Sequence, residues 1–130
     1  MAWVELVTLL AIVQFVVFGL LVGRARMQHQ VPAPAMSGHE IFDRYFRVHM
    51  NTLETLVGLL PSMWIAAQYW SPRWCAAIGA VYLVGRQVYL KSYVADPKKR
   101  SLGYSLSFLP VAVLLLAALV GIARSLLRGS

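Results

Sequence analysis

Four long apolar runs constrain this chain more than any other feature of its sequence. They cover about residues 3–23, 45–69, 74–93 and 104–123. A helix needs roughly 20 predominantly apolar residues to cross the hydrocarbon core of a bilayer. The sequence therefore predicts an all-α membrane protein, a bundle of four transmembrane helices, with residues 1–130 forming a single integral membrane domain. The first run lacks a basic leader and a small-residue cleavage site, so we expect it to stay as a membrane helix.

The composition argues against an ordinary soluble enzyme. Apolar residues make up 59% of the chain and charged residues only 13%, and the mean hydropathy is +0.65. Soluble domains carry about 25% charged residues. The net charge of +7 does not indicate nucleic acid, because the basic residues gather at the ends of the apolar runs. One cysteine and three histidines without ligand spacing predict no metal site.

Basic residues are unequally shared between the two sides of the predicted bundle. The first and third connections with their flanks carry Arg24, Arg26, Arg44, Arg47, Lys91, Lys98, Lys99 and Arg100, and the opposite side carries Arg73, Arg124 and Arg128. Basic residues concentrate in cytoplasmic connections. We therefore expect the first and third connections in the cytoplasm and both termini on the other side.

Polar residues follow one face of the second predicted helix. At about 100° per residue, Arg47, Asn51 and Glu54 lie within roughly 60° of one another. Ionisable groups at membrane depth are expensive, so they normally face a bundle interior or a cavity and mark function. Snorkelling to the headgroups would account for Arg47 alone, but Asn51 and Glu54 lie deeper. The pattern favours a polar cleft.

The third predicted helix carries a matching row, formed by Tyr82, Arg86, Tyr89 and Tyr93 at spacings of 4, 3 and 4. Such a row lies on one helix face, so it can face the row on the second helix. Arg86 and Glu54 have similar predicted depths and could form an ion pair, within one chain or between two. Tyr89 or Tyr93 taken singly could equally be a belt residue at the membrane interface.

Together these side chains suit a small zwitterion with several carboxylates. Arg26, Arg47 and Arg86 offer forked donors that match carboxylates. Glu54 can accept from an ammonium group, while Asn51 and the tyrosines can bind amides. Lipid-soluble compounds would arrive from the bilayer.

Three sequence motifs in order resemble those of the MAPEG superfamily, the membrane-associated proteins in eicosanoid and glutathione metabolism. Residues 42–54 read FDRYFRVHMNTLE, similar to the signature FxRxxRxHxNxxE. Residues 82–89, YLVGRQVY, followed by Tyr93, Pro97, Arg100 and Gly103, resemble a second stretch, and residues 22–26, VGRAR, resemble a third. The resemblance covers nearly the whole chain.

This resemblance implies a homotrimer of four-helix subunits, with glutathione bound between neighbouring subunits near the cytoplasmic face. The implied glutathione-binding residues are Arg26, Arg47, Asn51, Glu54, Tyr89 and Tyr93, with Arg86 as a further contact. Arg100 matches the arginine that stabilises the thiolate in the family's transferases. A thiol with a pKa of about 8.5 is mostly protonated at neutral pH, and an adjacent guanidinium favours the nucleophilic anion.

Two positions depart from the leukotriene-forming members. Thr55 stands where they have a tyrosine, and Met27 stands where they have a second arginine. An eicosanoid pocket is therefore not supported, and the chain most resembles the short, general-purpose members.

The resemblance implies a glutathione transferase that conjugates hydrophobic electrophiles in detoxification, with peroxidase activity as an accompanying possibility. A non-catalytic scaffold of the same fold that binds lipid or another ligand is the alternative, and glutathione binding would discriminate between them. A four-helix multidrug exporter fits the length, but it would carry a carboxylate near the middle of the first helix. Here Glu5 is at the edge and only Gln14 is central.

Overall fold

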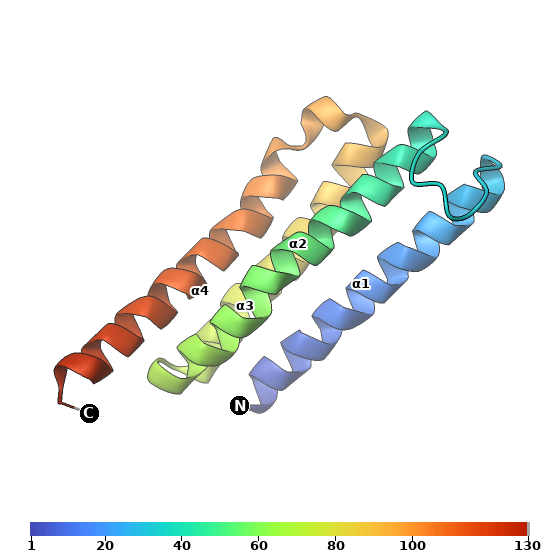
Figure 1. The fold of residues 1–130 in the computed structure, drawn as a ribbon. Helices are drawn as coiled ribbons and strands as arrows, with labels where there is room; N and C mark the ends of the chain where they lie inside the picture. The colour runs from blue at the N-terminus through green and yellow to red at the C-terminus, as the bar shows by residue number, and fades with distance from the viewer. Residues whose placement is uncertain (130) are drawn as a thin grey trace.

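The computed structural model describes residues 1–129 and consists of long α-helices joined by short connections (Figure 1). The helices are α1 (Ala2–Gln28), α2 (Glu40–Tyr69), α3 (Pro72–Ala95) and α4 (Ser101–Leu127), with a 3₁₀ helix η1 (Pro97–Lys99) between the last two. Each α-helix contains one predicted apolar run and extends a few residues beyond it. The prediction of an all-α fold is confirmed, with the polar flanks of each run also helical.

Within residues 1–129, α1 and α4 are long and apolar enough to cross a membrane, each with a mean hydropathy of 2.6 in its most apolar window. The polar rows on α2 and α3 lower the hydropathy of those two helices. The crossing of the membrane by α2 and α3 stays a prediction.

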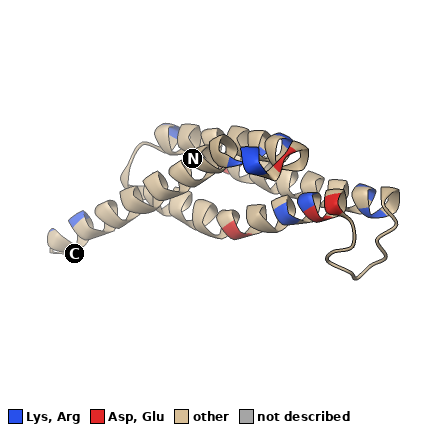
Figure 2. Ribbon diagram, turned by 90° about the horizontal axis from the view of Figure 1, so that it is seen from above, with Lys and Arg blue, Asp and Glu red and all other residues tan. Residues whose placement is uncertain are grey.

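The helices lie side by side along most of their length (Figure 1). Both chain termini lie at one end, which we call the terminal end. The connection of residues 29–39 and helix η1 lie at the opposite end, the loop end. Lys and Arg gather near the helix ends, and long stretches of ribbon between them carry no charged residue (Figure 2).

The interior and the exterior of the bundle are both apolar over much of its length. Residues of the core include Val4, Ala11, Leu59, Met63, Tyr82 and Leu114. Large apolar side chains also point outward from α1 and α4, with Leu20 68% exposed and Leu116 61% exposed. An apolar outer surface of this extent is typical of a partner or membrane interface.

Close packing of α4 on α3 sets the geometry of the loop end. A Cβ atom at Gly103 would lie 2.5 Å from the Cα atom of Tyr89, far inside van der Waals contact. Only glycine therefore lets the start of α4 approach the backbone of α3 this closely.

Candidate functional site

A cleft of about 630 Å³ opens at the loop end, where α2, α3 and α4 meet. We call it the polar cleft, and its lining residues are Arg47, Asn51, Tyr89, Tyr93, Arg100, Ser101, Tyr104 and Ser105. The structure thus brings together most of the residues singled out from the sequence. They come from three helices and are far apart along the chain.

The polar rows of α2 and α3 face each other, as predicted. The Nη1 atom of Arg86 donates to Oδ1 of Asn51 at 2.8 Å, and the hydroxyl groups of Tyr82 and Thr55 share a hydrogen bond of 2.6 Å. Thr55 is therefore engaged inside its own chain. These contacts fix the register of α3 against α2.

Arg86 lies behind the wall of the polar cleft and does not line it. Its side chain is fully buried, and Nε donates to the Ser107 hydroxyl at 2.9 Å while Nη1 also donates to the Thr52 hydroxyl at 3.2 Å. The guanidinium lies 4.4 Å from the ring centroid of Tyr89. In this single chain Arg86 reaches the cleft only through Asn51 and Tyr89.

An ion pair between Glu54 and Arg86 does not form within the chain, so that alternative is wrong. The Nε and Nη1 donors of Arg86 go to Asn51, Thr52 and Ser107 instead, and Nη2 is buried with no hydrogen-bond partner among the described residues. Glu54 is exposed and does not line the cleft. Glu54 lies three residues, about 4.5 Å, beyond Asn51 along α2, so Asn51 and Thr52 are at the depth of the Arg86 guanidinium and Glu54 is not. Pairing between subunits stays a prediction.

Arg26 lies apart from the polar cleft in this single chain. Its Nη1 atom donates to the carbonyl oxygen of Ala35 at 2.8 Å, and its guanidinium lies 4.8 Å from the ring centroid of Phe42. The first contact holds the connection of residues 29–39 against α1, and the second joins α1 to α2. A role of Arg26 in a site completed by a second subunit stays a prediction.

The connection between α3 and α4 holds Arg100 at the cleft. The Asp96 carboxylate accepts from the backbone N–H of Lys98 at 3.0 Å, and Asp96 N–H in turn donates to the carbonyl of Ser92 at 2.9 Å. Asp96 therefore ends α3 and begins η1. Lys98 and Lys99 are exposed and do not line the cleft, although they directly precede Arg100.

The sequence reasoning missed Ser101, Tyr104 and Ser105, which the first turns of α4 contribute to the cleft. The ring centroid of Tyr104 lies 6.3 Å from that of Tyr89 and 6.0 Å from that of Phe108. The sequence does contain a pattern that indicates these residues, because positions 101, 104 and 105 share one helix face directly after Arg100. The apolar run that follows masked it.

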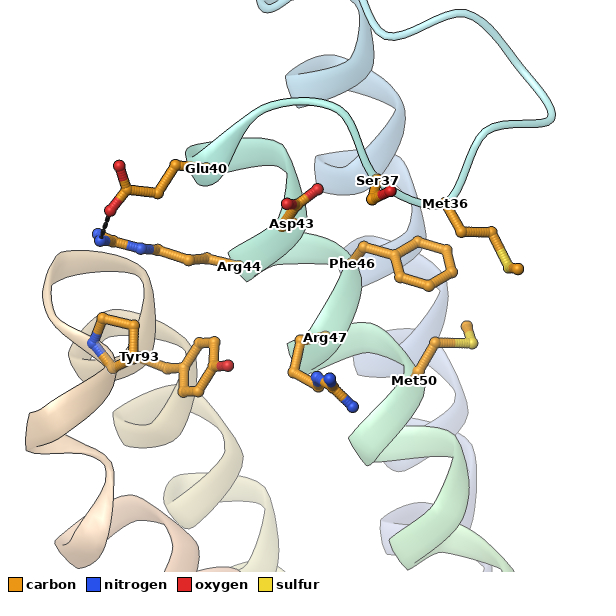
Figure 3. A pocket seen from close by; sticks show the side chains of 10 residues that line it. Met36, Ser37, Glu40, Asp43, Arg44, Phe46, Arg47, Met50 and Tyr93 are labelled. Carbon is orange, nitrogen blue, oxygen red and sulfur yellow. Dashed lines mark hydrogen bonds and ion pairs between the residues drawn. The ribbon is translucent and has the colours of Figure 1, made fainter.

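A second hollow of about 500 Å³ adjoins the polar cleft and shares Arg47 and Tyr93 with it. Its other lining residues are Met36, Ser37, Glu40, Asp43, Arg44, Phe46, Met50 and Pro97. Arg47 and Tyr93 lie on facing sides of this hollow (Figure 3). Its two carboxylates are engaged within the chain, since Glu40 pairs with Arg44 and Asp43 accepts from the N–H of Gly38 at 3.1 Å.

Comparison with known proteins settles the family. The family model described as MAPEG family matches residues 4–120. The chain belongs to the MAPEG family. It is 41% identical over 92% of its length to an uncharacterized protein of Synechocystis sp., covering 88% of that protein. It is 36% identical to human microsomal glutathione S-transferase 2, with 93% of this chain and 82% of the relative covered.

A third relative is leukotriene C4 synthase of Cavia porcellus, 32% identical over 94% of this chain and 92% of the relative. The resemblance inferred from the three motifs is therefore confirmed at the level of the family. Two of these relatives are named as enzymes, a glutathione transferase and a leukotriene synthase.

The polar cleft of this MAPEG protein presents hydrogen-bond donors and positive charge. Arg47 and Arg100 line it, and none of its lining residues is acidic. Oδ1 of Asn51 accepts from Arg86. The flipped orientation of this amide is excluded because it would place the Asn51 NH₂ group against the N–H groups of Arg86. The NH₂ group of the amide is therefore left to donate to another acceptor at the cleft that Asn51 lines. Such a surface is complementary to an anion with carboxylate and carbonyl oxygens.

Proposed function

We propose that this MAPEG protein is a membrane-bound glutathione transferase that joins glutathione to hydrophobic electrophiles. The observation that carries the proposal is the polar cleft itself, which has two arginines and no acidic residue in its lining. Glutathione carries two carboxylates and a single ammonium group, so it is a net anion that such a cleft suits. The apolar outer surface of α4 begins beside the cleft, which gives lipid-soluble acceptors a route to it.

The cleft residues that were predicted from the sequence have separate roles in this proposal. Arg47 and Tyr93, shared by the cleft and the adjoining hollow, bind a carboxylate of glutathione. The amide NH₂ of Asn51 donates to a peptide carbonyl, and Tyr89 adds a hydroxyl. Arg86 is a positioning residue, because its hydrogen bond holds the Asn51 amide in the required orientation.

Arg100 stabilises the thiolate of glutathione. Its guanidinium favours the anion over the neutral thiol, whose ordinary pKa of about 8.5 leaves little nucleophile at neutral pH. The sulfur then attacks the electrophilic carbon of the acceptor, a C–S bond forms, and the halide leaves with the electron pair of the broken bond. The thiol proton passes to water. The same thiolate would attack the O–O bond of a lipid hydroperoxide, giving the lipid alcohol and the sulfenic acid of glutathione. A second glutathione then forms the disulfide with release of water.

The proposal extends to the assembly. A homotrimer with four spans in each subunit, and with the loop end in the cytoplasm, would let Arg26 and Glu54 complete the site from neighbouring copies. Family membership supports this arrangement. Cross-linking of the detergent-solubilised protein tests it, since a monomer in the presence of glutathione would contradict the assembly while leaving the cleft of the single chain intact.

The test of the function is thioether formation with a chlorinated dinitrobenzene, followed by absorbance on the purified protein. We expect Arg100→Ala to lower kcat/KM by about 100-fold, the size of effect of removing one group that stabilises developing charge. Glutathione binding measured by calorimetry should change by less than about threefold. Arg100→Lys keeps the charge without the fork and should restore part of the rate.

Lys99→Ala is the matched control, because Lys99 is an exposed neighbour of Arg100 that does not line the cleft. Its rate should equal that of the unmodified protein. Full activity of Arg100→Ala would remove Arg100 from the mechanism. If the protein neither binds glutathione nor forms the thioether, the result would support the alternative, a non-catalytic scaffold of the same fold.

A further inference from the structure

A smaller pocket of about 360 Å³ lies at the terminal end, between the last turns of α2 and α4. We call it the terminal pocket, and its lining residues are Tyr69, Trp70, Gly121, Arg124, Ser125 and Arg128. The ends of α2 and α4 that line it lie at the opposite end of the bundle from the connection between α3 and α4, which borders the polar cleft (Figure 1). The transferase proposal assigns it no role.

The walls of the terminal pocket are fixed by contacts within the chain. The indole N–H of Trp70 donates to the carbonyl of Ala117 at 2.8 Å, which locks the ring against α4. The guanidinium of Arg124 lies 5.4 Å from the centroid of that ring, a cation–π geometry. At Gly121 a Cβ atom would lie 2.6 Å from the Cβ of Tyr69, so glycine admits Tyr69 to the surface of α4.

The charge of the terminal pocket selects an anion. Arg124, in the last turn of α4, and Arg128, the residue that caps this helix, both line the pocket, and none of the lining residues is acidic. The planar fork of arginine matches the oxygens of a phosphate group. Two guanidinium groups at one pocket therefore suit a single phosphate.

The surroundings of the terminal pocket indicate that this phosphate is attached to a lipid. The pocket lies at the end of α4, which is long and apolar enough to cross a membrane. Tryptophan and tyrosine are enriched at the depth of the lipid headgroups, and Tyr69 and Trp70 stand at this position. Leu119 and Val120, about one turn further into the span than Arg124, are 55% and 47% exposed, which offers acyl chains an apolar contact.

We propose that the terminal pocket binds the headgroup phosphate of one anionic phospholipid. Arg124 and Arg128 hold the phosphate oxygens, and the ring of Trp70 packs against the glycerol region. This site is separate from the polar cleft and holds a structural lipid with no part in the thiol chemistry.

The experiment measures lipid retention and thermal unfolding of the full chain purified in detergent. The probes are phosphatidylglycerol, phosphatidylcholine and inorganic phosphate. We expect native mass spectrometry to find phosphatidylglycerol retained, and the unfolding midpoint to rise by about 4 °C with it. Phosphatidylcholine and inorganic phosphate should each raise the midpoint by less than about 1 °C.

Variants locate the effect. Arg124→Gln and Arg128→Gln should each weaken phosphatidylglycerol binding by about tenfold, the size of one lost charged hydrogen bond. Arg124→Lys should weaken it by about threefold, because the charge remains and the fork is lost. Arg73→Gln is the matched control, since Arg73 is an exposed arginine at the same end that lies outside the terminal pocket. It should bind as the unmodified protein does.

Three results would overturn the proposal. An equal loss of binding in Arg73→Gln would reveal diffuse surface charge and no specific site. Equal stabilisation by inorganic phosphate would mean that the occupant is a soluble anion, and equal stabilisation by phosphatidylcholine would mean that the anionic charge is irrelevant. The lipid comparison needs only the unmodified protein, so it can still overturn the proposal if a variant fails to fold.

Discussion

An arginine stacks on an aromatic ring at each end of the bundle, and the two pairs differ in their surroundings. At the loop end, Arg86 lies 4.4 Å from the ring centroid of Tyr89 and is fully buried. At the terminal end, Arg124 lies 5.4 Å from the ring centroid of Trp70 and is exposed. A buried charge is unfavourable unless it is hydrogen-bonded, whereas an exposed one is solvated.

The partners of Arg86 explain how the loop end accommodates its charge. Asn51, Thr52 and Ser107 accept hydrogen bonds from the guanidinium, and all of them are neutral. The positive charge is therefore stabilised by hydrogen bonds without being neutralised by a carboxylate. Its field stays available to an anion in the polar cleft. The loop end thus holds its arginine in place by hydrogen bonds, whereas at the terminal end the Trp70 ring is fixed and the Arg124 side chain is exposed.

The largest expected difference between the two ends comes from glycine. Gly103→Ala should lower the free energy of unfolding by about 3 kcal/mol, because the new Cβ meets the backbone of Tyr89, which cannot move without separating α3 from α4. Gly121→Ala should lower it by about 1 kcal/mol, because the Cβ of Tyr69 that the new atom meets belongs to the last residue of α2, where a helix end can shift. Denaturant titration in mixed micelles measures both.

Gly23→Ala is the control for these glycine variants, because a Cβ at that position meets nothing within 4 Å. It should raise stability by about 0.5 kcal/mol through helix propensity alone. Equal losses at positions 103 and 121 would contradict the close packing assigned to the loop end.

Removing one hydrogen bond at each arginine–aromatic pair should also cost more stability at the loop end than at the terminal end. Ser107→Ala leaves Nε of the buried Arg86 without its partner and should lower the free energy of unfolding by about 2 kcal/mol. Trp70→Phe removes an exposed hydrogen bond to Ala117 and should lower it by about 0.5 kcal/mol. A larger loss of unfolding free energy for Trp70→Phe than for Ser107→Ala would contradict the assignment of the tighter contacts to the loop end.

Arg86 should also affect ligand binding from behind the cleft wall. Arg86→Met removes the charge at similar volume and releases the Asn51 amide, so glutathione affinity should fall about tenfold in calorimetry. Arg86→Lys keeps the positive charge but loses the planar guanidinium, so its glutathione affinity should fall less. The difference between the two variants separates the effect of the charge from the effect of the Asn51 amide orientation. Unchanged affinity in both variants would leave Arg86 with a packing role only.

The smallest effect is expected for the exposed arginine. Arg124→Gln should change the free energy of unfolding by less than about 0.5 kcal/mol in lipid-free detergent, because exposed charges contribute little. Thermal unfolding with and without lipid measures it. A loss above about 1 kcal/mol without lipid would show that the terminal end depends on this contact for folding.

Hydrophobic periodicity was enough to predict the helices and the facing polar rows. The four apolar runs all became helices, and the rows carried by α2 and α3 met through Asn51 and Arg86. Periodicity gives the angle of a side chain around its helix, but not its depth relative to a neighbouring helix. For this reason it could not decide between Asn51 and Glu54 as the partner of Arg86.

Other features depended on folding that no local pattern encodes. The position of Arg26 depends on the path of residues 29–39, which returns to Arg26 and takes up its donors. Tyr104 begins an apolar run, so the hydropathy of its neighbours indicated a packing role. In the structure it lines the polar cleft together with Arg100. In both cases tertiary contacts decided the outcome.

The most direct test of the central claim is a calorimetric titration of reduced glutathione into the purified protein and into its Asn51→Leu variant. The arrangement of donors around Asn51 predicts saturable heat at millimolar glutathione for the unmodified protein, and affinity at least about tenfold weaker for the variant. No saturable heat in the unmodified protein, or equal affinity in the two proteins, would contradict the assignment of the polar cleft as the glutathione site.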